Sequence, residues 1–200
     1  MQELLNRLSW LTSMRMVNNM EVTRVDDLFV FQPITYKDNR GFFIELHNEE
    51  KYRQYGFFET FVQDNLSHSK KGVIRGLHMQ SGEHAQGKLV YCLRGKIKDV
   101  FVDCRKESST YGKVYSFYLS EDDKKHVFAP KGFAHGFSVV SDEALVFYKS
   151  TNLYNFSKEV TISPLDERLN IDWSLTKDEY EISQKDKEGI SFAEFTKQQD

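Results

Sequence analysis

The sequence has few cysteines and prolines, little net charge and no long apolar run. It contains 2 cysteines and 3 prolines in 200 residues. Cys92 and Cys104 stand alone in apolar, strand-like runs, so we expect buried free thiols in a reducing compartment. This excludes a disulfide framework and a cysteine metal site. No apolar run approaches the length of a transmembrane helix, so we expect a cytoplasmic protein that does not span a membrane.

The charge balance limits which classes of partner the protein would attract. A formal net charge of -3 and a pI near 6.1 give no overall attraction to nucleic acid or to acidic membranes, so we expect neither as a partner. Aromatic residues are abundant instead, with 16 Phe and 10 Tyr. Together with the low proline content, they suit a protein rich in β-strands.

The first 22 residues differ from the rest. Leucine and methionine recur on one helical face of residues 4–14, which is a weakly amphipathic pattern. The segment has neither the apolar core nor the cleavage site of a signal peptide, so a docking helix, a disordered leader or upstream translation all fit. We therefore divide the chain into a leader, residues 1–22, and a single domain, residues 23–200, with a polar C-terminal tail.

Short β-type runs follow one another from Thr60 to Lys149. Turn signals separate them, for example at residues 68–72 and 120–125. Many short strands at regular spacing are typical of a sandwich or barrel, so we predict an all-β, antiparallel core. Helix signals are confined to the leader, residues 48–56 and the tail.

Residues 88–104 resemble a β-hairpin. The first strand would cover residues 88–93 and the return strand residues 96–104. The turn between them, Arg94-Gly95, would use the positive φ that glycine allows. Lys88 opens the first strand, where it faces either solvent or a functional site.

The stretch RGLHMQSGEHAQGK, residues 75–88, first suggests a metal site. Barrel metal sites often use His-x-His, a nearby carboxylate and a distant histidine. Here His78, Glu83 and His135 fit that pattern, but Gln80 stands where the second histidine would be. Two histidines and one carboxylate are still compatible with a facial triad. Because glutamine is a poor substitute for imidazole, we favour a metal-free site, with His84 and Glu83 in a connecting loop.

Arg75 and His78 are three residues apart. Strict alternation along a strand sends them to opposite faces. If both serve one pocket, the strand must bulge between them, and Gly76 makes a bulge easy.

Polar residues elsewhere add to this stretch. Arg40 lies on a turn before the aromatic run 42–45, Gln63 to Asn65 end a strand, and Tyr148 lies near the end of the last strong strand. Each alone is more often structural. Together they would supply cations for a diphosphate, a base, an acid and amide contacts.

The chain resembles the dTDP-4-dehydrorhamnose 3,5-epimerase family, whose members act on nucleotide-linked 4-keto-6-deoxy sugars. The resemblance runs from about residue 24 to about residue 187. It rests on seven motifs in the family's order and spacing: DNRGFF, FVQDN, VIRGLH, AQGKLV, DVFVDCRKES, PKGFAHGF and LVFYK.

The resemblance implies a double-stranded β-helix, the cupin-like jelly roll, with a few short peripheral helices. It also implies a homodimer that exchanges strands and works without a metal or other cofactor. The implied reaction inverts C3 and C5 of a dTDP-linked 4-keto-6-deoxyhexose. Protons are removed beside the 4-keto group and returned from the other face.

Four residues match the family's catalytic positions. His78 matches the general base, and Asp186 matches the carboxylate that pairs with it, given a one-residue insertion. Lys88 matches the cation beside the developing enolate, and Tyr148 matches the acid on the opposite face of the sugar.

Other residues match substrate-binding positions. Arg40 and Arg75 match phosphate contacts, and Arg40 would reach the site of a neighbouring subunit. His135 would line the pocket. The remaining residues at positions that hold the nucleotide or frame the cavity are Phe43, Glu45, Gln63, Asn65, Tyr154, Glu159 and Lys185.

The chain also departs from the family's pattern. Residues 163–166, SPLD, replace a frequent Trp-Asn-Asp run, which predicts a reshaped cavity wall, and Met79 and Leu153 replace frequent aromatics. Three alternatives stay open: an epimerase of C3 only or C5 only, or one acting on a GDP-heptose; a non-catalytic sugar-nucleotide-binding protein; and a metal-dependent enzyme on the same fold.

Overall fold

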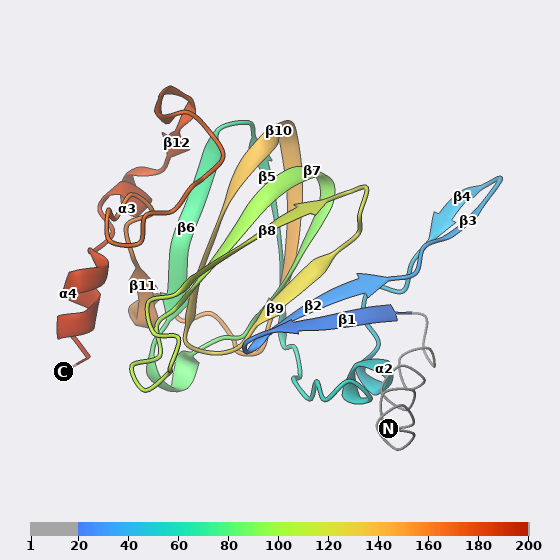
Figure 1. The fold of residues 1–200 in the computed structure, drawn as a ribbon, viewed down its shortest axis with the longest axis horizontal. Coiled ribbons are helices and arrows are strands. Elements are labelled where there is room, and N and C mark those ends of the chain that lie inside the picture. The colour runs from blue at the N-terminus through green and yellow to red at the C-terminus, as the bar shows by residue number, and fades with distance from the viewer. Residues whose placement is uncertain (1–19, 200) are drawn as a thin grey trace, which may run out of the picture.

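The computed structural model describes residues 20–199. Its strands are β1 (Met20–Val25), β2 (Leu28–Pro33), β3 (Tyr36–Asp38), β4 (Gly41–Phe43), β5 (Gln63–Lys70), β6 (Val73–Gln80), β7 (Lys88–Asp103), β8 (Val114–Ser120), β9 (His126–Ala129), β10 (Phe133–Ser150), β11 (Glu159–Thr161) and β12 (Glu181–Ile182). The helices are α2 (Glu49–Arg53), α3 (Gln184–Lys187) and α4 (Phe192–Lys197), with 3-10 turns η1 (Gly82–His84), η2 (Phe156–Lys158) and η3 (Lys177–Glu179). Figure 1 shows the strands gathered in the centre and the C-terminal helices at one side.

Two layers of strands share β7 and β10. We call them the β5 layer and the β6 layer. The β5 layer runs β1-β2-β9-β7-β10-β5 through the first half of β7 and the second half of β10. The β6 layer runs β8-β7-β10-β6-β11 through the other halves of the same two strands. All these pairings are antiparallel, so the predicted all-β, antiparallel core is confirmed, and the cupin-like jelly roll accounts for the two layers.

The predicted hairpin at residues 88–104 is wrong. β7 is one strand of 16 residues, and both of its halves pair with β10. Gly95 has φ +75°, as expected, but its left-handed backbone bends the strand from one layer into the other instead of reversing it. β10 bends at the same level, where its register with β7 shifts between Val139 and Ala144.

Short helices form where the sequence predicts them. The Asn48 side chain caps α2 by accepting a hydrogen bond from the Lys51 N–H, and α3 and α4 lie in the tail. The predicted leader lies outside the described residues apart from residues 20–22, which belong to β1. Within residues 20–199, no helix is both long and apolar enough to cross a membrane.

The core has two parts that matter for the site. Apolar side chains between the layers, such as Val90, Phe101 and Val146, form one cluster. A second cluster lies under the tail, where Trp173 and Phe195 pack against the outer side of β6. The tail is therefore anchored over β6. Cys92 and Cys104 are buried and free, which confirms the prediction of buried free thiols.

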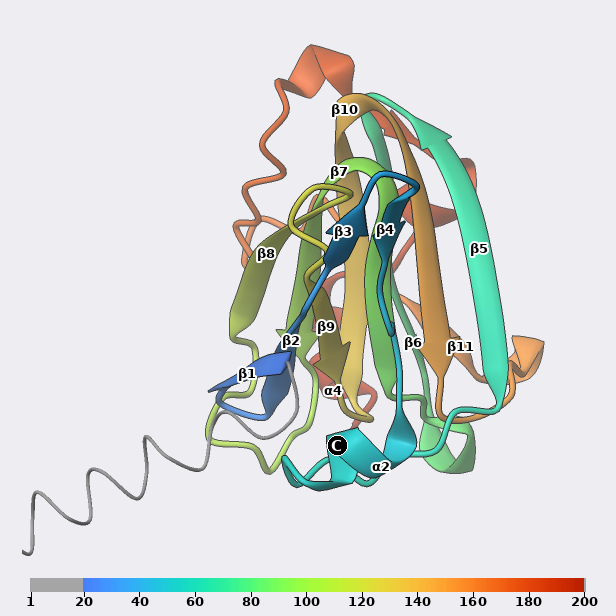
Figure 2. The ribbon, with the colours of Figure 1, turned by 90° about the vertical axis from the view of Figure 1, so that its right-hand side faces the viewer.

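β3 and β4 form a separate two-stranded hairpin. Figure 1 shows it projecting from the body of the domain, away from the C-terminal helices, and in Figure 2 it lies in front of the other strands. Phe42 and Phe43 on β4 are 60% and 67% exposed. The hairpin therefore carries apolar side chains that the rest of residues 20–199 leaves largely exposed.

Candidate active site

One cavity lies between the two layers. It has a volume of about 200 Å³ and is lined by Gln63, Asn65, His78, Met79, Gln80, Gln86, Lys88, Tyr148, Ser150, Tyr154 and Glu159. The β5 layer supplies Lys88, Tyr148 and Ser150, and the β6 layer supplies His78 and Gln80. A molecule in this cavity meets side chains from both layers.

A bulge in β6 places His78. His135 pairs with His78 and Phe137 with Arg75, so three steps along β6 oppose two along β10. Gly76 has φ +118°, and a Cβ there would lie 2.6 Å from the Cα of Gly136. The bulge predicted at Gly76 is therefore present, and it requires glycine on both strands.

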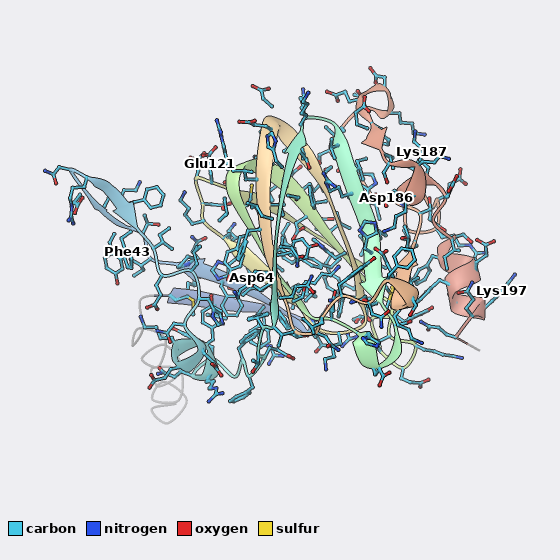
Figure 3. The ribbon with its side chains drawn as sticks, turned by 180° about the vertical axis from the view of Figure 1, so that it is seen from behind. Phe43, Asp64, Glu121, Asp186, Lys187 and Lys197 are labelled. Atoms are coloured by element: carbon cyan, nitrogen blue, oxygen red, sulfur yellow. The ribbon has the colours of Figure 1, made fainter. Side chains whose placement is uncertain are left out.

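His78 is held by a carboxylate from the tail. Its Nε2 lies 2.6 Å from Asp186 Oδ1, and the Gly76 N–H donates to Asp186 Oδ2 at 3.2 Å. Figure 3 shows Asp186 on the tail beside β6. Ser183 caps α3 by accepting from the Asp186 N–H, so the helix start fixes this carboxylate. The two residues are 108 positions apart in the sequence.

The His78–Asp186 pair determines which nitrogen of the imidazole carries the proton. Burial works to raise the pKa of Asp186, but hydrogen bonds from His78 and the Gly76 N–H outweigh it and hold that pKa below its ordinary value. A charged carboxylate can only accept, so Nε2 of His78 carries the proton and Nδ1 keeps its lone pair. His78 can then take a proton at Nδ1 and become a cation stabilised by Asp186.

Lys88 is a buried cation in the same cavity. Its Nζ donates to the His78 carbonyl at 3.1 Å and lies 5.9 Å from the centre of the Tyr148 ring. Burial lowers the pKa of Lys88 to about 8, although the negative charges of Glu159 and Asp99 work to raise it. Lys88 is therefore mostly protonated at neutral pH, and it faces the cavity instead of solvent.

Tyr148 enters from the opposite layer to His78. Burial raises the pKa of Tyr148, and the positive charge of Arg75 offsets this only in part. The phenol is thus protonated at neutral pH and can donate. A base and an acid from opposite layers can reach the two faces of a ring held between them.

A network at the cavity rim fixes three of the predicted residues. Glu159 accepts from Lys185 Nζ at 2.7 Å and from the Tyr154 hydroxyl at 3.0 Å. Burial works to raise the pKa of Glu159, but these two donors hold it below its ordinary value. Glu159 therefore stays charged, and Lys185 connects it to the helix that carries Asp186.

Gln63 and Asn65 form the β5 wall. Gln63 Oε1 accepts from the Tyr154 N–H at 2.8 Å, and Gln63 Nε2 donates to Asn65 Oδ1 at 2.9 Å. Arg75 lies at the edge, where its Nε donates to Ser69 Oγ at 3.0 Å, and it is not among the cavity-lining residues.

His135 lies behind the cavity instead of lining it. Its Nε2 is 2.7 Å from Asp99 Oδ1, and its ring lies 6.3 Å from the Tyr148 ring. Burial raises the pKa of Asp99 and lowers the pKa of His135, while the contact between the two side chains works against both shifts. It supports the Tyr148 side of the site from within the core.

Three predicted residues are not brought to this cavity within the chain. Arg40 is paired with Asp38, Glu45 Oε1 lies 2.8 Å from Lys51 Nζ, and Phe43 is exposed. All three belong to the projecting hairpin or to the segment just after it, and Figure 3 shows Phe43 far from Asp186.

The stretch that first suggested metal has a structural explanation. Gln80 donates to the Leu153 carbonyl at 3.3 Å and accepts from the Asn155 N–H at 2.6 Å, so it holds the loop over the cavity. Glu83 and His84 lie in η1, the connecting loop, as predicted. Among residues 20–199, no group of three or more His, Cys, Asp or Glu side chains could hold a metal ion.

Residues 163–166 do not form the reshaped cavity wall that was predicted. Pro164 O accepts from Trp173 Nε1, and Asp166 accepts from the Phe192 N–H. This segment therefore anchors the tail instead of lining the cavity.

Sequence reasoning missed Asp99, Gln86 and Ser150. Asp99 could have been found, because an aspartate inside an apolar strand is buried only with a partner. Gln86 and Ser150 carry no such signal, since short polar residues at strand ends are common.

Comparisons with known proteins agree with this geometry. A family model described as dTDP-4-dehydrorhamnose 3,5-epimerase matches residues 22–194. The dTDP-4-dehydrorhamnose 3,5-epimerase of Salmonella typhimurium is 46% identical over 156 residues, which are 78% of this chain and 85% of that protein.

Two solved structures share the fold. The 3,5-epimerase of Legionella pneumophila, in complex with dTDP-4-keto-L-rhamnose, has a TM-score of 0.83 and 42% identity over 88% of this chain and 96% of that one. A double mutant of a 3'-monoepimerase from Streptomyces bikiniensis, in complex with dTDP, has a TM-score of 0.81 and 26% identity over 88% and 89% of the two chains. With the family model covering most of its length, the chain belongs to the dTDP-4-dehydrorhamnose 3,5-epimerase family.

Proposed function

We propose that this protein inverts C3 and C5 of a dTDP-linked 4-keto-6-deoxyhexose, giving the dTDP-4-dehydrorhamnose configuration. One observation carries the proposal. A single cavity holds the His78–Asp186 pair in one layer, protonated Tyr148 in the other, and the buried Lys88 cation beside both.

These groups fit proton removal beside a ketone. His78 Nδ1 takes the proton from C3, and the electron pair of the broken C–H bond moves into the carbonyl to give an enolate at O4. Lys88 is buried in the cavity wall, and a fixed cation held away from bulk water stabilises that charge strongly. Tyr148 gives a proton to the same carbon from the other face, which inverts it. The same steps at C5 complete the reaction once solvent has restored both groups.

The dTDP-linked substrate class is supported by the names of the similar proteins and by the cations near the cavity. Arg75 at the edge and Arg40 on the hairpin are assigned to the diphosphate, because guanidinium groups bind phosphate oxygens well. Gln63, Asn65, Tyr154, Glu159 and Lys185 frame the rest of the binding site.

A homodimer is part of the proposal. Arg40, Phe43 and Glu45 lie away from the cavity of their own chain, on or next to a projecting hairpin with exposed aromatic side chains. We assign them to the cavity of a partner subunit, which then completes the site. We also place the enzyme in the cytoplasm, in keeping with two reduced, buried thiols. The division into a leader and a domain is also proposed, with β1, which begins at Met20, counted in the domain.

Inversion at C3 alone is the second candidate. The similarity to a 3'-monoepimerase favours keeping it, because that protein shares the fold and about a quarter of the residues. A base and an acid at one carbon would suffice for it.

Product analysis by NMR tests the proposal. The protein incubated with dTDP-4-keto-6-deoxyglucose should give the doubly inverted keto sugar. His78→Asn should remove nearly all turnover while the protein stays folded. No inversion by the unmodified protein, or normal turnover by H78N, would contradict the assignment.

A further inference from the structure

The β5 layer presents a polar wall to the cavity. Along β10, Tyr148 and Ser150 are two residues apart and both line the cavity. Across the strands, Ser150 pairs with Lys88 of β7 and with Gln63 of β5, while Tyr148 pairs with Asn65. Ser150 therefore stands in one row with Lys88, next to Tyr148.

The Ser150 hydroxyl has no hydrogen-bond partner within residues 20–199. The residue is 1% exposed, and within the described part of the chain no hydrogen-bond partner is found for its Oγ. A buried hydroxyl without a partner destabilises a fold. Such a group in the wall of an open cavity is explained when a bound molecule supplies the missing hydrogen bond.

A second unpaired group shares this wall. Asn65 Nδ2 is buried, and residues 20–199 provide no partner for it. The amide orientation is set from behind, because Asn65 Oδ1 accepts from Gln63, whose own oxygen accepts from the Tyr154 N–H. Asn65 is thus held with its donor unused. A donor amide and a hydroxyl together suit an acceptor oxygen.

The position within the cavity indicates which part of a substrate is bound. The reacting ring must lie within reach of His78 and Tyr148, and Ser150 is beside Tyr148 on the same strand. Arg75, assigned to the diphosphate, lies at the edge instead. The oxygen that meets Ser150 therefore belongs to the sugar and not to the nucleotide.

We propose that Ser150 is a further substrate-binding residue, whose hydroxyl acts with the Asn65 amide to bind a hydroxyl or carbonyl oxygen of the hexose ring. The inference rests on the proposed function for the identity of the ligand. It assigns sugar recognition to a residue outside the family motifs.

Ser150→Ala tests this, with Ser67→Ala as the matched control. Ser67 Oγ is also buried and unpaired among the described residues, and Ser67 lies on β5 next to the wall, but it does not line the cavity. S150A should lower kcat/KM at least tenfold without lowering Tm, because an unpaired hydroxyl is removed. S67A should leave kcat/KM unchanged. Ser150→Cys should behave as S150A does.

Binding separates the sugar from the nucleotide. Measured by calorimetry, S150A should raise the Kd of dTDP-glucose at least fivefold and leave the Kd of dTDP unchanged. An equal loss for dTDP would overturn the proposal, as would a kcat/KM within twofold of the unmodified protein. If the unmodified protein has no epimerase activity but S150A still loses affinity for dTDP-glucose alone, the sugar contact stands and the proposed reaction fails.

Discussion

His78 works as a base because its two ring nitrogens have different tasks. Asp186 accepts a hydrogen bond from the Nε2–H group of His78 at 2.6 Å, and this fixes the tautomer that leaves Nδ1 able to accept a proton. The carboxylate also stabilises the imidazolium that forms when a proton is taken. The neighbouring His135 pairs with Asp99 in the core, where burial lowers the pKa of His135, so the two histidines of one strand pair are not equivalent.

Asp186→Asn should lower kcat by about 100-fold or more, because an amide neither fixes the tautomer nor stabilises the cation. KM should change little, since Asp186 lies behind His78. Steady-state kinetics with Asp178→Asn as the control would show this, because Asp178 is an exposed tail residue. A D186N enzyme with full kcat would remove the carboxylate from the mechanism.

Lys88 sets the alkaline side of the pH profile. Its pKa falls from 10.5 to about 8 in the folded protein, so the cation is lost as pH rises through about 8. We expect kcat to fall over that range, and Lys88→Arg to move the fall to higher pH, since arginine stays charged. A profile that K88R leaves in place would contradict the assignment.

The same shift in the pKa of Lys88 makes stability depend on pH in the opposite direction to kcat. Between pH 8 and 10.5, the unfolded chain holds a proton that the folded protein has lost. The contribution of Lys88 to the free energy of unfolding therefore rises with pH in that range. Burying the Lys88 cation lowers stability at neutral pH. The lysine nevertheless lies at a position suited to enolate stabilisation.

At the scale of elements, β6 depends on its bulge. The bulge lets His78 face the cavity while Leu77 packs in the core beneath the tail. Gly76 and Gly136 touch there, with no room for a side chain on either.

Gly76→Ala should destabilise the protein by about 2–4 kcal/mol, because a Cβ at φ +118° is strained and overlaps Gly136. Gly82→Ala is the control. Gly82 also has positive φ, +61°, but nothing lies within 4 Å of its added Cβ, so the cost should be only about 1 kcal/mol. Urea denaturation measures both. Equal effects would show that the close approach of β6 and β10 does not matter.

The elements also show what sequence reasoning can reach. Arg75, Gly76 and His78 lie in one short segment, so alternation along a strand was enough to predict the bulge. Gly95 was misread because a positive φ serves a reversal and a bend equally well. Only the pairing of β10 with both halves of β7 separates them. Asp186 comes from the tail, and resemblance alone pointed to it.

At the scale of the whole molecule, the chain places its predicted site residues in two regions. The cavity holds the groups for proton transfer, and the projecting hairpin with the segment after it carries Arg40, Phe43 and Glu45. A dimer in which each hairpin reaches the other cavity joins the two regions.

Mixing two inactive variants tests that arrangement. Arg40→Ala and His78→Asn should each be nearly inactive, but a mixed dimer has one site with both native residues. Random exchange of subunits should restore about a quarter of the native activity, because half of the dimers are mixed and each has one complete site. No recovery, with exchange shown by differently tagged subunits, would mean that Arg40 does not act across the dimer.

Solvent deuterium uptake tests the central claim most directly. The account places one base and one acid on opposite faces of the sugar, with the ketone activating both neighbouring carbons. In D2O, NMR and mass spectrometry of the keto sugar should show deuterium at C3 and C5 with both centres inverted, and H78N should show neither. Uptake at C3 alone would contradict the double inversion, and no uptake at either carbon would contradict the proton-transfer mechanism itself.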